Sequence, residues 1–229
     1  GNLGELDAAA SITGPIVGDK IAGRLHAVRR KRDGLYDVST RRGARTADED
    51  ADRDLTAVRG QLQFQADTLD ARLIADYARR EENCCLSTQI NVGSSAPLID
   101  ALASDSGVAN PAQPFERLAF PNRSTEQSVR DKGVALDLNW DLPYGTLTSI
   151  SAYRNYDSGQ PGDIDYSAVD ILYRSPDGGG GTRESKTFSQ ELRLQGSAFD
   201  GMLDWLVGAY YADEDADRDL TAVRGQLQF

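Results

Sequence analysis

Alternation of apolar and polar residues recurs along most of the chain, and it restricts the fold more than any other feature. One apolar series in residues 131–142 is Val134, Leu136, Leu138, Trp140 and Leu142, and one in residues 202–212 is Leu203, Trp205, Val207, Ala209 and Tyr211. A period of two belongs to β-strands, whose successive side chains point to opposite faces. Helical spacing fits these segments no better, so the pattern predicts an all-β chain.

Eight such segments precede the last residues, and their lengths suit tilted strands that cross a membrane in about 9–11 residues. We expect them near residues 3–16, 20–37, 54–66, 68–82, 131–142, 145–157, 187–198 and 202–212. Tight turns are expected at Gly18-Asp19, Ala66-Asp67, Pro143-Tyr144-Gly145 and Asp200-Gly201. Long polar connections at 38–53, 83–130 and 158–186 alternate with these turns; the last contains the run Gly178-Gly179-Gly180-Gly181.

Short turns at one end and long loops at the other are typical of outer-membrane barrels. We therefore predict an antiparallel up-and-down meander of about eight or nine strands, forming a transmembrane β-barrel or a fragment of one. Strands that are neighbours in sequence should pair, and no helix should exceed about three turns.

Composition narrows the class of protein. Apolar residues make up 39% of the 229, but no run of about 18 is apolar enough for a transmembrane helix. The net charge of −11 argues against nucleic acid as a partner. The start, Gly1-Asn2-Leu3-Gly4, does not resemble a signal peptide, so we expect a processed or excised piece.

Aromatic residues fall towards the predicted strand ends. Membrane barrels place Tyr and Trp there as interfacial girdles, because one edge of the ring is apolar and the other is wet. Ordinary packing on the face of a sheet is the alternative. The residues concerned are Tyr36, Tyr77, Trp140, Tyr153, Tyr156, Trp205, Tyr210 and Tyr211.

The segment ADEDADRDLTAVRGQLQF occurs twice without a difference, at residues 47–64 and 212–229. Natural repeats diverge, so exact identity indicates a recent duplication, an assembly error or deliberate construction. We divide the chain into a partial barrel, residues 1–211, and the copied segment, residues 212–229. The copy is expected to add a ninth strand, and it ends on Leu227 and Phe229, which share a face.

Cys84 and Cys85 are the only cysteines. Neighbouring thiols cannot link distant segments, so a vicinal disulfide or a free pair is expected, exposed in the loop 83–130. Metal and redox sites need spaced ligands such as CxxC, so we expect no metal there.

Alternating carboxylates at Asp48, Asp50, Asp52 and Asp54 resemble part of a calcium loop. An EF-hand is excluded, because Arg53 and Arg59 stand where that loop needs Gly and Glu. Weak calcium binding and a solvated acidic loop remain the two interpretations. The second copy repeats the run at Asp213, Asp215, Asp217 and Asp219.

Catalytic signals are sparse. His26 is the only histidine, so a Ser-His-Asp hydrolase would have to use it. Ser94-Ser95 and Ser104-Asp105-Ser106-Gly107 have ordinary linker composition, and neither a GxSxG elbow nor a phosphate-binding glycine loop is present. We predict no enzyme activity, no catalytic residue and no cofactor.

Four segments, in order, resemble hairpins from the barrel of TonB-dependent receptors: residues 11–38, 55–85, 140–158 and 187–214. The resemblance covers nearly all of the chain up to Glu214, with Cys84 and Cys85 at the start of an outer loop. It lies in the order of segments and in no single motif.

The resemblance implies the N-terminal part of a barrel of about 22 strands. The parent would lie in the outer membrane of a Gram-negative bacterium and import a ferric siderophore or similar scarce nutrient. Its partners would be the lipid bilayer, the small ligand and, through a plug absent here, TonB. The alternatives are a hydrolase or esterase and an engineered β-scaffold without transport activity.

Charged residues on the expected inward face bear on whether the chain closes by itself. They are Arg72, Asp76, Asp137, Glu191 and Arg193. In a narrow barrel such charges must pair or stay hydrated. An open sheet would leave two bare edges. We expect either self-association through those edges or an imperfect small barrel, and no transport by this chain alone.

Overall fold

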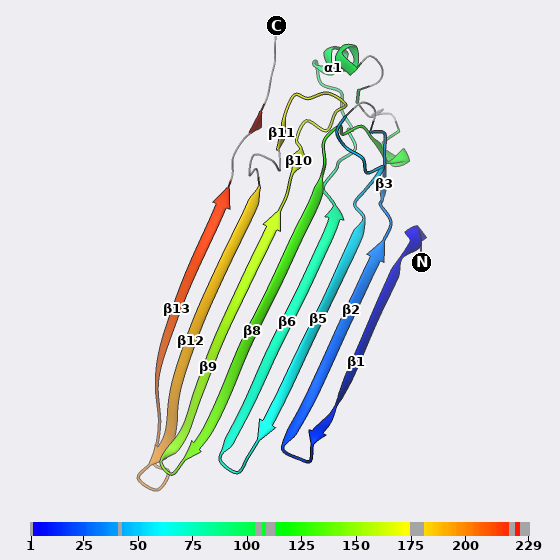
Figure 1. Cartoon of the computed structure of the whole chain (residues 1–229). Helices are drawn as coiled ribbons and strands as arrows, with labels where there is room; N and C mark the ends of the chain where they lie inside the picture. Colours follow the sequence, from blue (N-terminus) through cyan, green and yellow to red (C-terminus); the bar gives the residue numbers. More distant parts are fainter. Residues whose placement is uncertain are drawn as a thin grey trace.

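A computed structural model describes residues 2–40, 43–103, 107–108, 113–174, 181–219 and 223–224. Eight long strands dominate it and lie side by side as one tilted sheet (Figure 1). Their bounds are β1 Leu6–Val17, β2 Ile21–Arg32, β5 Arg53–Gln65, β6 Leu69–Asn83, β8 Glu126–Leu142, β9 Gly145–Gly159, β12 Thr182–Ala198 and β13 Leu203–Asp219.

Each strand pairs antiparallel with its neighbour along the chain, in the order β1-β2-β5-β6-β8-β9-β12-β13. The predicted all-β meander is therefore confirmed. All four predicted tight turns lie at one end of the sheet, at the foot of Figure 1. Three of them use positive φ angles at glycine, at Gly18, Gly145 and Gly201, a conformation that costs a residue without a Cβ little.

The long connections rise from the opposite end, and together with the two ends of the chain they contain short elements. These are η1 Asn2–Gly4, β3 Tyr36–Val38, β4 Glu49–Asp50, α1 Ala96–Ala103, η2 Pro114–Glu116, β7 Leu118–Ala119, β10 Gly162–Asp163, β11 Tyr173–Arg174 and β14 Val223–Arg224. The short strands among them form two small sheets, β4-β3-β7 and β10-β11-β14. In the part of the chain that the structure describes, no helix is long and apolar enough to cross a membrane.

Several strand boundaries differ from the prediction: β1 begins three residues later than expected, and β8 and β12 each begin five residues earlier. The strand expected at 20–37 is two strands, since β2 ends at Arg32 and β3 joins a different sheet. The strand expected at 202–212 continues to Asp219, because β12 offers backbone partners as far as Thr182. The copied segment thus begins inside β13. Among the described residues it adds no ninth strand to the long sheet, and Val223–Arg224 pair with β11 instead.

The long sheet is open, with β1 and β13 as its two edges. Figure 1 shows these edges on opposite sides of the molecule. The small closed barrel that we considered is therefore not formed. The outer backbone groups of both edge strands are left without a ladder partner within this sheet, as in a segment cut from a larger barrel.

The two sides of the long sheet differ in chemistry. Along the register, Leu62 of β5 lies opposite Leu73 of β6, and Leu73 lies opposite Leu136 of β8. We call this side the apolar face; it also carries Ile12, Leu25, Leu138, Leu192 and Val207. The other side, the polar face, carries the row Ser11, His26, Arg59, Asp76, Gly133, Arg154, Thr187 and Glu214.

Residues of the apolar face are exposed: Ile12 retains 72% of its surface, Val207 67% and Trp140 50%. The buried apolar side chains described all lie instead in the connections at the loop end, where all of them except Phe120 form two clusters. One contains Val38, Leu86 and Ala119, and the other Ala96, Ile99 and Val108. We call the described parts of 33–52, 84–125 and 160–174 the loop cap.

Candidate functional site in the loop cap and on the polar face

Asp50 lies at the centre of the loop cap and has no exposed surface. Its carboxylate accepts hydrogen bonds from the Arg45 Nη2 atom at 3.1 Å, the Leu86 amide at 3.2 Å and the Thr125 hydroxyl. Arg45 is also buried, and its guanidinium donates to the carbonyls of Ala47 and Glu49 at 2.8 and 2.7 Å. The ion pair lies within one connection, and its contacts with Leu86 and Thr125 tie it to the connection between β6 and β8. Every charged atom has partners, as burial requires.

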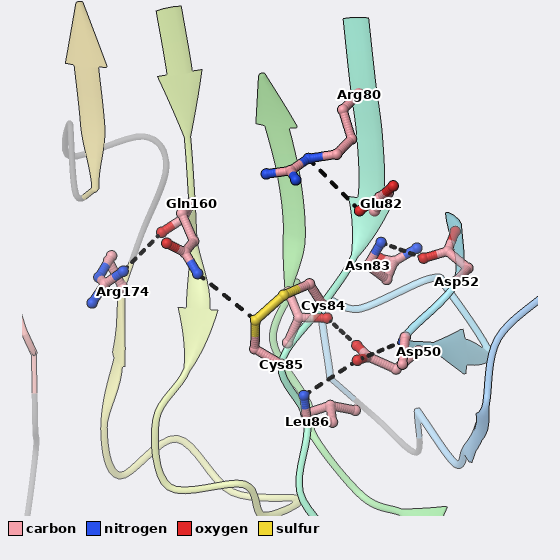
Figure 2. Close-up of a disulfide and its surroundings, with 12 residues drawn as sticks. Asp50, Asp52, Arg80, Glu82, Asn83, Cys84, Cys85, Leu86, Gln160 and Arg174 are labelled. Carbon is pink, nitrogen blue, oxygen red and sulfur yellow. Dashed lines mark hydrogen bonds and ion pairs between the residues drawn. A yellow bond between two sulfur atoms is a disulfide. The ribbon is translucent and has the colours of Figure 1, made fainter. Parts of the chain in front are cut away.

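The vicinal disulfide Cys84–Cys85 sits beside Asp50, where the chain leaves β6 (Figure 2). The Cys84 amide donates to the Thr125 carbonyl at 3.0 Å, and Gln160 Nε2 lies 4.0 Å from Cys85 Sγ. Cys85 has a φ of +82°, which is rare for a residue with a side chain. Cys85 is exposed and Cys84 half-buried. The disulfide therefore marks the point where the β6, β8 and β9 connections meet.

Asp163 anchors a second polar cluster in the loop cap. It accepts hydrogen bonds from the amides of Asn122 at 2.9 Å, Arg123 at 3.1 Å and Tyr166 at 2.8 Å. Burial, and to a lesser extent the charge of Asp165, raises the pKa of the Asp163 carboxyl to about 6.

Arg123 holds the adjacent edge of this cluster. Its guanidinium binds the Asp170 carboxylate through two nitrogens, one at 2.7 Å, and lies 4.1 Å from the centre of the Tyr173 ring. The hydrogen bond from Arg123 lowers the pKa of Asp170. Sequence analysis did not single out Arg45, Asp163, Asp170 or Arg123, since no spacing motif brings these loops together.

The four calcium candidates are not brought together. Asp50 binds Arg45, Asp54 binds both terminal nitrogens of Arg29, and Asp52 accepts from the Asn83 amide. The run bends at Ala51, whose φ is +59°. No group of three metal-ligating side chains occurs among the described residues. In β13 the second run lies along an exposed strand, described to Asp219.

His26 lies on the polar face, opposite Ser11 of β1 and Arg59 of β5. Its buried Nδ1 atom has no hydrogen-bond partner in the described structure. Ser94 and Ser95 lie in the loop cap before α1, and Ser104, Asp105 and Ser106 fall outside the described residues. The hydrolase residues considered from the sequence are thus not assembled in the part described.

Charges on the polar face pair with one another, either across strands or, for Arg193 and Glu191, along one strand, and pairing is one of the two outcomes expected for them. Arg154 of β9 binds Asp76 of β6 at 3.1 Å and Asp131 of β8 at 2.6 Å. Arg72 lies 3.6 Å from Asp137, and Arg193 lies 2.9 Å from Glu191. The polar face is therefore a lattice of partly exposed ion pairs that still faces water.

Aromatic residues lie at two levels of the apolar face. Trp140 and Trp205 lie near the tight turns, and Tyr77, Tyr153, Phe188 and Tyr211 lie nearer the loop end. Three predicted girdle residues lie elsewhere: alternation places Tyr156 and Tyr210 on the polar face, and Tyr36 is in β3. The alternation of side chains along each strand already assigns Tyr156 and Tyr210 to the polar face, whereas nearness to a strand end does not distinguish the two faces.

No family model matches the sequence, and no curated protein matches it. Solved structures do match the fold. The ferric yersiniabactin uptake receptor FyuA from Yersinia pestis aligns with a TM-score of 0.63 and 11% identity over 93% of this chain. The siderophore receptor PiuA from Acinetobacter baumannii gives 0.54 and 16% over 92%, and a G324V mutant of the ferric enterobactin receptor PfeA from Pseudomonas aeruginosa gives 0.54 and 10% over 95%.

In each case this chain spans 29% of the matched receptor. The resemblance to TonB-dependent receptors is confirmed at the level of the fold: the chain is built like one part of the β-barrel of siderophore receptors.

Proposed function

We propose that this chain is the N-terminal part of the barrel of a TonB-dependent transporter in the outer membrane of a Gram-negative bacterium. The main observation behind this proposal is that apolar side chains of the sheet lie exposed on one face and charged side chains lie on the other. The long sheet exposes its apolar face, whereas its polar face is lined with ion pairs. A hydrocarbon environment outside and a wet lumen inside satisfy both faces.

The parent protein would import a ferric siderophore or a similarly scarce nutrient. The folds of FyuA, PiuA and PfeA support this class of cargo. The loop cap would form part of the outer entrance, since long connections of outer-membrane barrels face outwards. TonB would act through the plug of the parent, which would sit against the polar face. The segment 212–229 stays, in this proposal, a copy of 47–64 attached to the barrel portion.

The two tryptophans test the orientation of the apolar face directly. Trp140 and Trp205 are the only tryptophans and both lie on that face. When the chain is refolded into phosphatidylcholine vesicles, brominated acyl chains should strongly quench the fluorescence of each tryptophan. The variants Trp140→Phe and Trp205→Phe each leave one tryptophan, so the two signals can be measured separately. Quenching by aqueous iodide and none by brominated lipid would contradict the proposal.

We infer further that the isolated chain does not transport, because two sheet edges lack partners. Liposomes containing this chain, a ferric siderophore and the TonB system should show no energy-dependent uptake. Crosslinking should instead capture edge-to-edge oligomers through β1 or β13, because bare edges pair with other strands. Energy-dependent uptake by this chain alone would overturn this inference.

A further inference from the structure

We propose that Arg130 and Lys132, at the loop end of the apolar face, bind the phosphate of an anionic lipid head group in the adjacent leaflet. The inference rests on the proposed function, because it requires the apolar face to lie in a bilayer. It adds a specific lipid contact on the outside of the barrel.

Both residues lie on β8 and point to the same side as its apolar residues. Strand alternation places Arg130 and Lys132 in one series with Val134, Leu136 and Leu138. The register sets Lys132 opposite Tyr77, and Arg130 opposite Arg79, both on β6. We call Arg79, Arg130 and Lys132 the outward cation patch; all three are exposed.

The patch begins where the apolar series ends. Along β8 the change from Val134 to Lys132 takes two residues, or roughly 6–7 Å of strand. Tyr77 and Tyr153, the outward aromatic residues of the neighbouring strands, lie at the same border. Tyr and Trp occupy the head-group level of membrane barrels, so the guanidinium and ammonium groups lie at the level of lipid phosphates.

The protein compensates this charge only in part, since the Glu184 carboxylate interacts with the charge of Lys132 but is itself bound to Lys186. Arg79 binds Glu81, but neither Arg130 nor Lys132 makes an ion pair among the described residues. Asp157, the register partner of Arg130 on β9, forms none with it. Like charges directly opposite one another destabilise a sheet, so an anion bound between Arg79 and Arg130 would relieve their repulsion. Phosphate suits that place, because Arg binds it through a planar fork.

Two other cations on the same side of the sheet are already paired, and a third, Lys31 of β2, lies opposite the carboxylate-bearing Asp54. Arg29 of β2 binds Asp54, and Lys186 of β12 binds Glu184 at 2.8 Å and lies opposite Asp215. Lys186 is therefore a matched control: it has the same charge and lies in the same register row as Lys132, through Asn155.

The test measures lipid selectivity with the full chain in phosphatidylcholine vesicles. Electron spin resonance would compare the immobilised fractions of spin-labelled phosphatidic acid and spin-labelled phosphatidylcholine at the protein surface. We expect a preference for phosphatidic acid on the order of several-fold, since each membrane-surface cation contributes measurably. Arg130→Gln with Lys132→Gln should remove most of it, and Lys186→Gln should leave it nearly unchanged.

The outcomes separate this inference from the proposed function. Equal immobilisation of both lipids by the unaltered chain, or a preference that survives the double substitution, would overturn the lipid site and leave the barrel proposal standing. Absence of any immobilised lipid would show that the apolar face does not contact the bilayer, and it would overturn both. Brominated-lipid quenching of Trp140 and Trp205 in every variant verifies that insertion is unchanged.

Discussion

The loop cap and the long sheet treat apolar residues in opposite ways. In the loop cap Val38, Leu86 and Ala119 are buried together, as in a water-soluble domain. In the sheet Ile12, Trp140 and Val207 keep half or more of their surface exposed. The long polar connections thus fold together on small cores of their own, whereas the larger sheet needs a cover supplied from outside the chain.

The duplicated segment makes the same comparison with identical residues. Residues 47–54 bend, form β4 and enter β5, whereas residues 212–219 continue straight along β13. Asp50 in the first copy is fully buried beside Arg45, and its counterpart Asp215 is exposed opposite Lys186. Strand propensity is the same in both places, so the tertiary partners decide the structure.

The largest effect expected comes from breaking the buried pair. Asp50→Ala leaves the Arg45 guanidinium buried without its counter-ion and should destabilise the loop cap by about 3–5 kcal/mol. Hydrogen exchange of the Val38 and Ser39 amides, which donate to Asp48 and Ala119, measures the free energy of opening. Asp215→Ala removes the same residue from the second copy and should change stability by less than about 0.5 kcal/mol.

Equal costs at Asp50 and Asp215 would show that burial does not distinguish the two copies. Amide exchange around Leu69, at the end of β6 that is far from Asp50, should stay the same in both variants. That control separates loosening of the loop cap from general unfolding of the sheet.

The next effect concerns the two faces of the sheet. Leu73 lies midway along the apolar side of β6, and Ile74, the next residue, points to the polar face. In phosphatidylcholine vesicles Leu73→Arg should cost about 2–4 kcal/mol, because a cation is moved into hydrocarbon. Ile74→Arg should cost about 1 kcal/mol or less. Urea unfolding monitored by tryptophan fluorescence gives both values, and a reversed order would exchange the lipid and water sides.

Much of the sheet could be predicted because its determinants are local. The period of two at Leu203–Tyr211 and the glycines at Gly18 and Gly201 each identify a strand or turn without knowledge of other segments. The loop cap could not be predicted in that way. Its central contact joins Arg45 and Asp50 to Thr125, which is 75 or more residues away.

The residues of the candidate site show the same difference between local features, which the sequence predicts, and contacts between distant segments, which it does not. Adjacent cysteines could be placed in a loop from the sequence, but the partners of Cys84 and Cys85, such as Gln160, come from another connection. The alternating acids suggested one shared ligand, yet a bend at Ala51 sends Asp50 and Asp54 to different arginines. Periodicity gives the direction of a side chain and not its partner.

A smaller, pH-dependent effect should appear in the loop cap only. The pKa of Asp163 is raised to about 6 in the folded chain, from the ordinary value of 3.8 that the unfolded chain retains. Between about pH 4 and 6 the folded state therefore holds more proton than the unfolded state, so this group lowers stability as pH rises, by at most about 1.4 kcal/mol per unit. Asp163→Asn should remove that part of the slope in the exchange of loop-cap amides. A slope that persists unchanged would assign the titration to another group.

The smallest effect expected is that of reducing Cys84–Cys85. The disulfide closes a ring of only two residues, so it restricts the unfolded chain little, and its loss should cost the loop cap on the order of 1 kcal/mol. Without the disulfide, Cys85 still has to keep its φ of +82°, which favours glycine. Cys84→Ser with Cys85→Gly should therefore be more stable than Cys84→Ser with Cys85→Ser by about 1 kcal/mol. Exchange of the Val38 amide in the two variants gives the difference, and equal values would mean that Cys85 leaves the positive φ region once the disulfide is gone.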